Sequence, residues 1–190
     1  MQTIKNNLSN EIIIKNSRFI CLLIKINNID ISDILNNIKL SYPKATHYCY
    51  GFIYNNYKKS SDDGEPTGTA GNPILFVLEK NNLNNILCVV VRYFGGIKLG
   101  AGGLLRAYTK SVSECLKKIE FVELIEGYKI ELEFNYNEEK QINYILDKST
   151  IIKKEYNKTI NYQVLVSKDI LNKLHNYKYN IIEKLYLEKV

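Results

Sequence analysis

Alternating apolar and polar positions mark the first strands of the chain. The segment 11–26 (EIIIKNSRFICLLIKI) alternates and is rich in β-branched residues, which predicts one long strand or a hairpin broken near Asn16 and Ser17. In 45–54 (ATHYCYGFIY) aromatic side chains recur at every second position, so another strand is predicted there. The run 87–93 (LCVVVRY) is continuously apolar, which is typical of a strand with both faces buried.

Two helices are predicted where apolar residues recur every three or four positions. The first covers 31–40, begins behind Asp30 or Ser32 as its N-cap, and ends before a proline. The second covers 100–119 and follows a glycine-rich stretch. Between the strand at 45–54 and the apolar run we expect a polar, glycine-rich loop.

The last third of the chain alternates regularly between the two kinds of element. The expected strand, helix, strand, strand, helix and strand lie at 128–136, 138–146, 150–156, 160–167, 170–177 and 181–187. That is the ferredoxin-like order β-α-β-β-α-β. Eight of the ten glycines lie between Gly64 and Gly103, so composition also separates the two parts. We therefore predict an α+β protein with domains at 1–123 and 124–190.

The composition is that of an ordinary globular protein. Of the 190 residues, 45% are hydrophobic and 24% charged. No apolar run approaches the roughly 18 residues that a membrane helix needs, and the first residues lack the apolar part of a secretory signal. We therefore expect a cytoplasmic protein without membrane contact. Its four cysteines are widely separated and lie mostly in apolar segments, so disulfides are not expected.

The net charge of +6 indicates an anionic partner such as nucleic acid, although an A/T-rich genome would also enrich lysine. Residues 1–123 hold 15 Lys and Arg against 10 Asp and Glu, whereas 124–190 hold 11 against 10. Only Arg18, Arg92 and Arg106 stand among 23 lysines. Their planar five-donor groups fit either an anion site or a fixed internal ion pair.

The segment 61–75 (SDDGEPTGTAGNPIL) combines acidic and turn-forming residues. Its acidic residues are Asp62, Asp63 and Glu65. Beside glycine and proline they predict a shaped loop, after which Thr67 or Thr69 caps a short helix. The carboxylates fit a site for a metal or a basic partner, or else a solvated turn. No metal or other cofactor is predicted, because an octahedral site needs ligands beyond one short loop.

A second motif, 89–108 (VVVRYFGGIKLGAGGLLRAY), runs from the buried strand through glycines into a helix. Its glycines are Gly95, Gly96, Gly100, Gly102 and Gly103. Backbone amides near a helix N-terminus suit an anion, with Arg92, Lys98 and Arg106 in reach. Close helix–strand packing that only glycine permits is the alternative. The motif is not a P-loop, because the required Lys and Ser/Thr are absent.

His47 and Cys49 project from the same face of a predicted strand, as half a metal site or a nucleophile pair would. Only His175 remains as another histidine, and no CxxC or HxxxH spacing occurs, so ordinary packing is favoured. No GxSxG is present for serine catalysis. No catalytic residue is predicted.

Together, these segments resemble the motif set of the YigZ/IMPACT family: Ser17-Arg18-Phe19, ATHYCY from Ala45, and the two long motifs in the family's order. The resemblance implies an N-terminal α/β sandwich similar to the second domain of a small-subunit ribosomal protein. It also implies a C-terminal domain similar to a late domain of elongation factor G, and a role in regulating translation. Eukaryotic members modulate an amino-acid-starvation kinase by binding its ribosome-associated activator, a partner that we do not carry over to this chain.

The resemblance also implies where the site lies. Residues expected to bind an anion or nucleic acid are Arg18, His47, Arg92, Gly95, Gly96, Lys98, Gly100, Gly102, Gly103 and Arg106. The motif loop contributes Asp62, Asp63, Glu65, Thr67 and Thr69.

Two classes of function fit this reading. A translation-associated regulatory protein would bind RNA, the ribosome or a translation factor through the glycine/arginine motif surface. The alternative is an enzyme or binding protein for a phosphorylated small molecule or nucleotide, since acids, arginines and glycines also serve phosphate chemistry. The missing phosphate-loop lysine and general base favour binding over catalysis.

Overall fold

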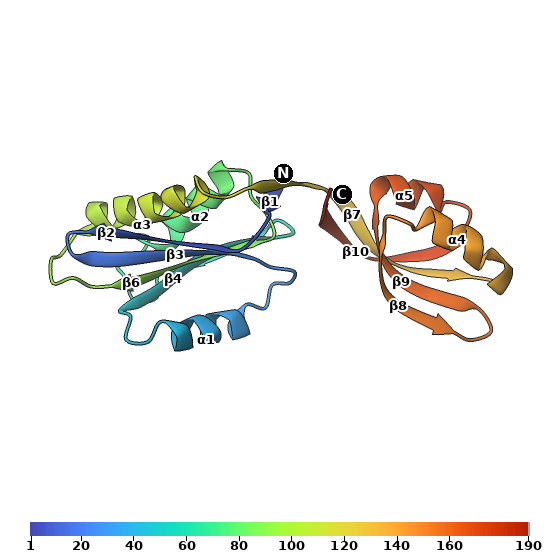
Figure 1. Ribbon diagram of the computed structural model, residues 1–190, viewed down its shortest axis with the longest axis horizontal. Helices are drawn as coiled ribbons and strands as arrows, with labels where there is room; N and C mark the ends of the chain where they lie inside the picture. Colours follow the sequence, from blue (N-terminus) through green and yellow to red (C-terminus); the bar gives the residue numbers. More distant parts are fainter. Residues whose placement is uncertain (190) are drawn as a thin grey trace. The chain divides into compact units, whose positions relative to one another are not determined.

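The computed structural model describes residues 1–189, which fold into two compact units. The first unit is Met1–Val122 and the second starts at Glu123. Each holds one antiparallel sheet with helices packed on it (Figure 1). The predicted α+β fold class is confirmed.

The first unit is built on a five-stranded antiparallel sheet with the order β2-β3-β6-β4-β5. Its strands are β2 (Leu8–Ile14), β3 (Ser17–Lys25), β6 (Ile86–Tyr93), β4 (His47–Tyr54) and β5 (Tyr57–Ser61). A short strand β1 (Gln2–Ile4) precedes them. The central strand β6 is buried along its length except at Tyr93, as its continuous apolar run predicts.

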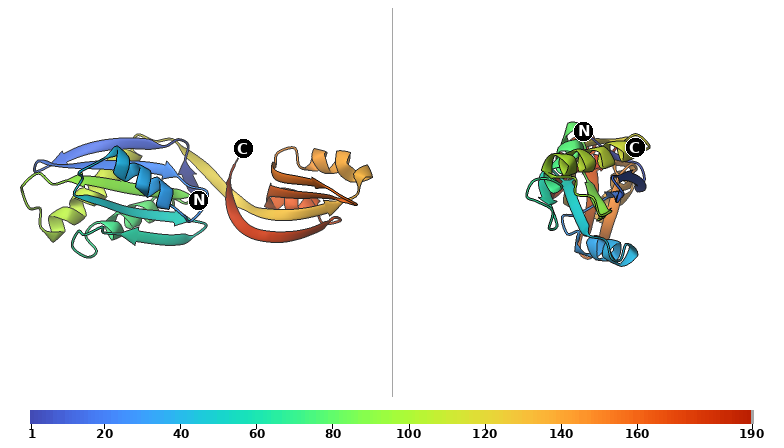
Figure 2. Two further views of the ribbon diagram at one scale, coloured as in Figure 1. Left: turned by 90° about the horizontal axis from the view of Figure 1, so that it is seen from below. Right: turned by 90° about the vertical axis from the view of Figure 1, so that its left-hand side faces the viewer.

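Helices cover both faces of this sheet. On one face lie α2 (Gly71–Lys80) and α3 (Ala101–Leu116), and on the other lies α1 (Ser32–Ser41) (Figure 1). The view in Figure 2 shows α1 lying across the strands. The core on the α2/α3 side includes Phe19 and Tyr108, whereas the α1 side is filled by residues such as Phe52. Burial on both faces explains why the central strand β6 has a continuous apolar sequence.

Two tight turns of the same kind connect neighbouring strands. Lys15 and Asn16 join β2 to β3 with φ of 44° and 62°, and Asn55 and Asn56 join β4 to β5 with φ of 46° and 68°. Two successive positive φ values are typical of the type I′ hairpin turn. The hairpin alternative for the first segment is therefore correct.

Strand β5 is a correction to the loop that we expected after Tyr54. It lies at the edge of the sheet, and its sequence, YKKSS, is polar, so no apolar alternation marks it. The strand exists because the Asn55–Asn56 turn folds the chain back onto β4.

The second unit has the predicted element order β-α-β-β-α-β. Its elements are β7 (Phe121–Phe134), α4 (Glu139–Ile145), β8 (Thr150–Tyr156), β9 (Ile160–Ser167), α5 (Lys168–Lys173) and β10 (Lys178–Glu188), with a 3-10 turn at Tyr136–Glu138. The sheet order is β10-β7-β9-β8, and every pair is antiparallel. β7 begins earlier than predicted because its first part pairs with β10 from Leu124 onward, where the sequence alternates poorly. None of the helices within residues 1–189 is long and apolar enough to cross a membrane.

Candidate functional site

The sequence motifs meet at one end of the sheet in the first unit, where β6 ends. In the β-sheet register His47 of β4 and Phe19 of β3 both lie opposite Arg92 of β6. The acidic loop before α2 and the side of α3 that carries Tyr108 close over these positions, because Glu65 and Tyr108 bond to each other there. Four segments far apart in the sequence therefore converge on Arg92.

A buried network of charged and polar side chains connects these segments. Arg92 Nη1 donates to Glu65 Oε1 at 2.6 Å, and the Tyr108 hydroxyl donates to the same oxygen at 2.7 Å. The side chains of Arg92 and Glu65 are only 6% and 3% exposed. Burying two charges is tolerated when they are paired and hydrogen-bonded to each other. The sequence allows an arginine to serve either an anion site or a fixed internal ion pair, and Arg92 forms the internal ion pair.

His47 and Cys49 extend this network toward the acidic loop. His47 Nδ1 lies 2.8 Å from the carbonyl oxygen of Asp63, and its Nε2 lies 3.8 Å from Glu65 Oε2. The Cys49 thiol lies 2.9 Å from the carbonyl oxygen of Asp62. Burial, with the nearby carboxylates, raises the pKa of Cys49 to about 12. A thiol that stays protonated is a poor nucleophile, so packing is its role here.

Tyr108, the buried tyrosine of the network, also has a raised pKa. Burial raises the pKa of Tyr108 far above its ordinary value, and the neighbouring Cys49 and Glu65 add to this. The Tyr108 hydroxyl therefore remains a hydrogen-bond donor to Glu65 at any physiological pH. In the sequence the spacing of Tyr108 indicates only an apolar position of the helix, and nothing in that spacing points to a role for its hydroxyl.

Asp62 holds the start of α2. Its Oδ2 accepts from the Gly68 amide at 2.8 Å, and its Oδ1 accepts from the Ala70 and Gly71 amides at 3.0 and 2.8 Å. Burial by itself raises the pKa of Asp62, but these three backbone bonds outweigh burial and lower the pKa overall. Asp62 therefore serves the helix and the loop rather than an external cation.

The predicted threonine cap of α2 is wrong. The N-cap residue is Ala70, and neither Thr67 nor Thr69 caps the helix by its side chain. Thr69 Oγ1 instead donates to the carbonyl oxygen of Pro66 at 2.6 Å, while Thr67 is exposed. The acidic side chain of Asp62 reaches the amides from a position eight or more residues earlier, a long-range contact that local capping rules do not detect.

Asp63 closes the turn between the loop and β4. Its Oδ2 accepts from the Tyr48 amide at 2.7 Å, and its backbone adopts φ of 43°. Within residues 1–189 no group of three or more His, Cys, Asp or Glu side chains is placed to hold a metal ion. The carboxylates of the acidic loop therefore bind the protein's own backbone and side chains.

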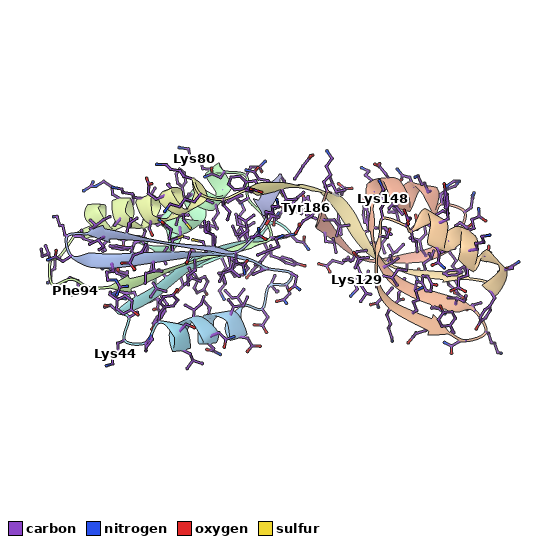
Figure 3. All side chains as sticks on the ribbon, viewed as in Figure 1. Lys44, Lys80, Phe94, Lys129, Lys148 and Tyr186 are labelled. Carbon is purple, nitrogen blue, oxygen red and sulfur yellow. The ribbon has the colours of Figure 1, made fainter. Side chains whose placement is uncertain are left out.

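Phe94 begins the loop that carries β6 over to α3. Its amide donates to Thr46 Oγ1 at 3.0 Å, and the hydroxyl of the preceding Tyr93 donates to the carbonyl oxygen of Pro43 at 3.2 Å. These bonds hold the loop against the segment that contains Lys44. Figure 3 shows Lys44 and Phe94 toward the same end of the first unit.

Gly95 fixes the other side of this loop. A Cβ atom on Gly95 would lie 2.1 Å from the carbonyl carbon of Asn16, so only glycine allows the loop to approach the β2–β3 turn. The Gly95 amide also donates to Ser17 Oγ at 3.1 Å. The exposed Lys15 of that turn is thereby held at the same end of the sheet.

The remaining glycines lead into α3. Gly100 is the N-cap residue and has φ of 71°, which explains glycine at that position. Gly96 is exposed and a side chain there would meet nothing within 4 Å. Gly103 packs on Leu99, since a Cβ atom would lie 3.1 Å from the Leu99 Cβ. Gly102 lies beside Arg106, whose Nη1 would be 3.6 Å from an added Cβ atom.

The cations at this end differ in how they are used. Arg18 makes a bidentate ion pair with Glu11, with hydrogen bonds of 3.0 and 2.8 Å. The Arg18 guanidinium carbon also lies 5.1 Å from the centre of the Tyr93 ring. Lys98 and Arg106 are exposed, and neither pairs with a carboxylate of residues 1–189. Of the three arginines, only Arg106 is thus free to meet a ligand.

We define the sheet-end surface by the exposed residues that these loops bring together. It consists of Lys15, Lys44, Phe94, Ile97, Lys98, Leu105 and Arg106. Phe94, Ile97 and Leu105 are 45%, 46% and 47% exposed, so the surface includes apolar as well as cationic groups. Of these seven residues, the sequence predicts only Lys98 and Arg106 as site residues, because the other five join them only when the loops are folded.

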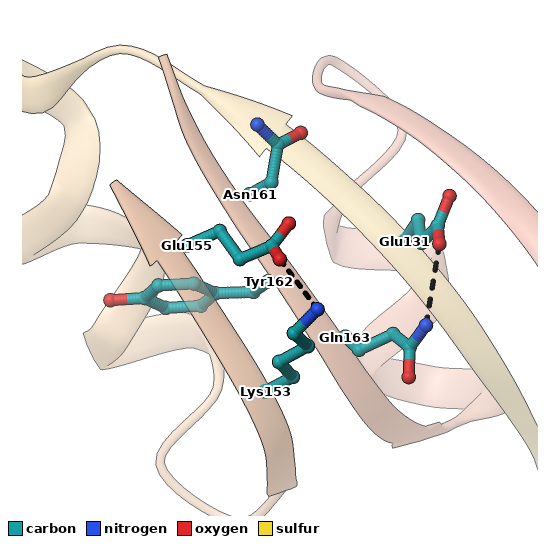
Figure 4. Close-up of a pocket in the computed structure, with 6 residues that line it drawn as sticks. All are labelled: Glu131, Lys153, Glu155, Asn161, Tyr162 and Gln163. Carbon is teal, nitrogen blue, oxygen red and sulfur yellow. Dashed lines mark hydrogen bonds and ion pairs between the residues drawn. The ribbon is translucent and has the colours of Figure 1, made fainter. Parts of the chain in front are cut away.

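The second unit offers a contrasting surface. A shallow hollow on its sheet is lined by Glu131, Lys153, Glu155, Asn161, Tyr162 and Gln163 (Figure 4). Lys153 pairs with Glu155 at 2.5 Å, and Gln163 donates to Glu131 at 3.3 Å. The charges on this face are mixed and already satisfied by one another, so we do not assign an anion site to it.

Comparison with known proteins now identifies the family. The model of the Impact N-terminal domain matches residues 15–116, a segment that contains both long motifs and every residue that bonds to Arg92. The chain belongs to the IMPACT family. This membership confirms the resemblance found in the sequence.

Individual relatives agree with this assignment. The chain is 48% identical over 125 residues to the IMPACT family member YvyE of Bacillus subtilis, which covers 64% of this chain and 58% of that protein. It is 39% identical over 141 residues to an IMPACT family member of Haemophilus influenzae, covering 71% of this chain and 68% of the relative. The match therefore spans little more than half of the first relative and about two thirds of the second.

A solved structure is similar along nearly the whole chain. The crystal structure of a hypothetical protein superposes with a TM-score of 0.73 at 28% identity, and covers 96% of this chain and 97% of its own. The similarity therefore extends over residues of both units.

Proposed function

We propose that this chain is a cytoplasmic regulator of translation that acts by binding RNA of the translation machinery through the sheet-end surface. The observation that carries the proposal is the set of exposed cations, Lys15, Lys44, Lys98 and Arg106, which pair with no carboxylate of residues 1–189. Family membership supplies the setting, because the resemblance implies a role in translation. A binding role also agrees with a buried network in which Glu65 bonds to both Arg92 and Tyr108 inside the fold.

Charge at this end favours an anionic partner. The nearby carboxylates are occupied: Glu11 of β2 bonds to Arg18, Glu65 to Arg92, and Asp63 to the Tyr48 amide. The exposed cations keep their full attraction for phosphates, which supply most of the affinity in sequence-independent binding of nucleic acid. The apolar residues between them add contact area, as is common where aromatic side chains meet unstacked bases.

The experiment compares wild type with Lys98→Glu/Arg106→Glu. We expect the wild-type chain to crosslink to rRNA or tRNA in cells and to sediment with ribosomes at low salt, and the double variant to lose both. Lys59→Glu/Lys80→Glu is the matched control, because it changes the net charge equally at two exposed lysines of the same unit. The control variant should behave as wild type.

Equal loss in both double variants would mean that net charge alone is responsible and that the sheet-end surface is not the site. If wild type neither crosslinks to RNA nor sediments with ribosomes, the proposal fails. The alternative of a phosphorylated small ligand would then be tested by thermal stabilisation with nucleotides, with and without Mg²⁺.

A further inference from the structure

We infer that Phe94 is a stacking platform for one unpaired base, so that the sheet-end surface takes single-stranded RNA rather than duplex. This inference rests on the proposed function and names its ligand more narrowly. It starts from the position of one aromatic ring between solvent and a buried cation.

One side of the Phe94 ring is occupied by protein. The Arg92 guanidinium carbon lies 5.5 Å from the centre of the Phe94 ring and 5.3 Å from the centre of the Phe19 ring. Phe19 is fully buried, whereas the Phe94 side chain is 45% exposed. Arg92 therefore lies between an inner and an outer ring, and the outer ring keeps a surface open to solvent.

The buried network fixes the position of this ring. Arg92 is held by Glu65 at 2.6 Å, and the Phe94 backbone is held by Thr46 at 3.0 Å. A platform that is ordered before the ligand arrives loses little conformational entropy on binding. This arrangement gives the most deeply buried charges of the motif a positioning role: they support the ring and make no contact with the ligand.

The surroundings of Phe94 suit a single strand. Gly96 follows without a side chain and with nothing within 4 Å of an added Cβ atom, so a base can approach the ring closely. Lys44 and Lys98 lie on the flanking loops and Arg106 lies in α3, and each of these exposed cations can meet a phosphate. In a duplex the base faces are hidden in the stack, whereas single-stranded RNA presents them to aromatic side chains.

An acidic peptide would also satisfy the cations. It would leave the open face of Phe94 without the planar partner that stacking requires, so the structure favours a base. The two ligands are separated by the test below.

The chain contains no tryptophan, which makes a direct test possible. Phe94→Trp in the full chain introduces a single fluorescent reporter at the platform. We expect a single-stranded RNA oligonucleotide to quench this tryptophan, and the same sequence as a duplex to leave it unchanged. Phe76→Trp is the matched control, because Phe76 is 58% exposed on α2 of the same unit. Its fluorescence should not respond to either RNA.

Affinity gives a second measurement that does not depend on the reporter. Stacking on one aromatic side chain corresponds to a change in affinity of about 5- to 140-fold. Phe94→Leu keeps the apolar contact but removes the aromatic face, so it should weaken binding of the single strand within this range. Phe94→Tyr should bind as wild type. Thermal melting of each variant shows whether the fold is retained.

Each outcome has one meaning. Single-stranded RNA that binds without quenching Phe94→Trp, or that binds Phe94→Leu with wild-type affinity, overturns the platform and leaves the proposed function intact. Quenching by an acidic peptide but not by RNA overturns the choice of ligand. Sedimentation with ribosomes without any binding of free RNA shows a protein partner and also overturns the platform. If free single-stranded RNA does not bind and the chain does not sediment with ribosomes, both the platform and the proposed function are overturned.

Discussion

Glu65 and Arg92 form an ion pair that is almost completely removed from solvent. The two charged atoms are 2.6 Å apart, and the side chains are 3% and 6% exposed. They come from the acidic loop before α2 and from the end of β6, the two segments that carry the family motifs. The pair therefore joins the two motifs inside the fold, and it lies directly beneath Phe94.

Breaking this pair is expected to destabilise the first unit strongly. Glu65→Ala leaves the Arg92 charge buried without a counter-charge, which costs about 3–5 kcal/mol in comparable pairs. The free energy of unfolding of the full chain, measured in urea, should fall by that amount. Arg18→Ala is the control, because it removes an exposed arginine with an equally well-formed ion pair. Similar losses in the two variants would contradict the structural role of the buried pair.

Asp62 should make stability depend on pH in a predictable direction. Its folded-state pKa is lowered below the ordinary value of 3.8, since the three backbone bonds outweigh the effect of burial. A lowered pKa means that the charged carboxylate stabilises the fold above about pH 4 and that this contribution is lost as pH falls further. Melting curves of wild type and Asp62→Asn between pH 7 and 3 should therefore converge at the acidic end. A difference that stays constant or grows toward pH 3 would show that the charge is not what stabilises α2.

Removing the side chain gives the size of the Asp62 contribution. Asp62→Ala deletes the acceptor for three amides, and loss of an N-terminal acceptor typically costs about 0.5–2 kcal/mol. Thr67→Ala, at the exposed position that a local rule would choose as the cap, should cost much less. Urea denaturation of both variants measures the difference.

The local pattern of apolar, polar and turn-forming residues was sufficient to predict most of the fold. The strands at Thr150–Tyr156 and Ile160–Ser167 have the predicted bounds, because each carries a clear apolar alternation or β-branched run between turns. The hairpin turn before Ser17 could be predicted because Asn16 stands there, and asparagine tolerates a positive φ. These features depend on neighbouring residues, and the sequence alone displays them.

The parts that could not be predicted depend on contacts between distant segments. β5 has no apolar pattern and exists only as an edge pairing with β4. The capping contact of Asp62 and the ion pair of Arg92 join residues many positions apart. The motif residues were recognised in the sequence, but which arginine is buried and which is exposed follows only from the packing of the loops.

Gly95 tests the close approach between the two loops. An added Cβ atom would lie 2.1 Å from backbone of the β2–β3 turn, so Gly95→Ala must displace either loop. Overpacking of this kind typically costs about 1–3 kcal/mol, and the melting temperature should fall accordingly. Gly102→Ala is the control, because its nearest neighbour is the flexible end of Arg106 at 3.6 Å. It should be neutral or slightly stabilising, since alanine favours the helix.

Salt dependence should report the number of cations that meet phosphates. For single-stranded RNA the logarithm of the binding constant falls with the logarithm of salt by about 0.7 for each phosphate neutralised. Lys98→Ala/Arg106→Ala should therefore reduce this slope by about 1.4, and Lys59→Ala/Lys80→Ala should leave it unchanged. A weaker affinity with an unchanged slope would place the two side chains outside the phosphate contacts.

The cysteines should be inert while the chain is folded. All four are free and buried, and burial raises the pKa of Cys49 to about 12, so its reactive thiolate is scarce at neutral pH. We expect an aromatic disulfide reagent to modify almost no thiol in the native chain at pH 8 and all four in denaturant. Cys21 and Cys88 lie closest, with their sulfur atoms 3.6 Å apart, yet both are shielded in the core beneath α3. Rapid reaction of one native thiol would show that the core around Arg92 and Tyr108 opens far more readily than its packing implies, and the fixed platform at Phe94 would then lose its support.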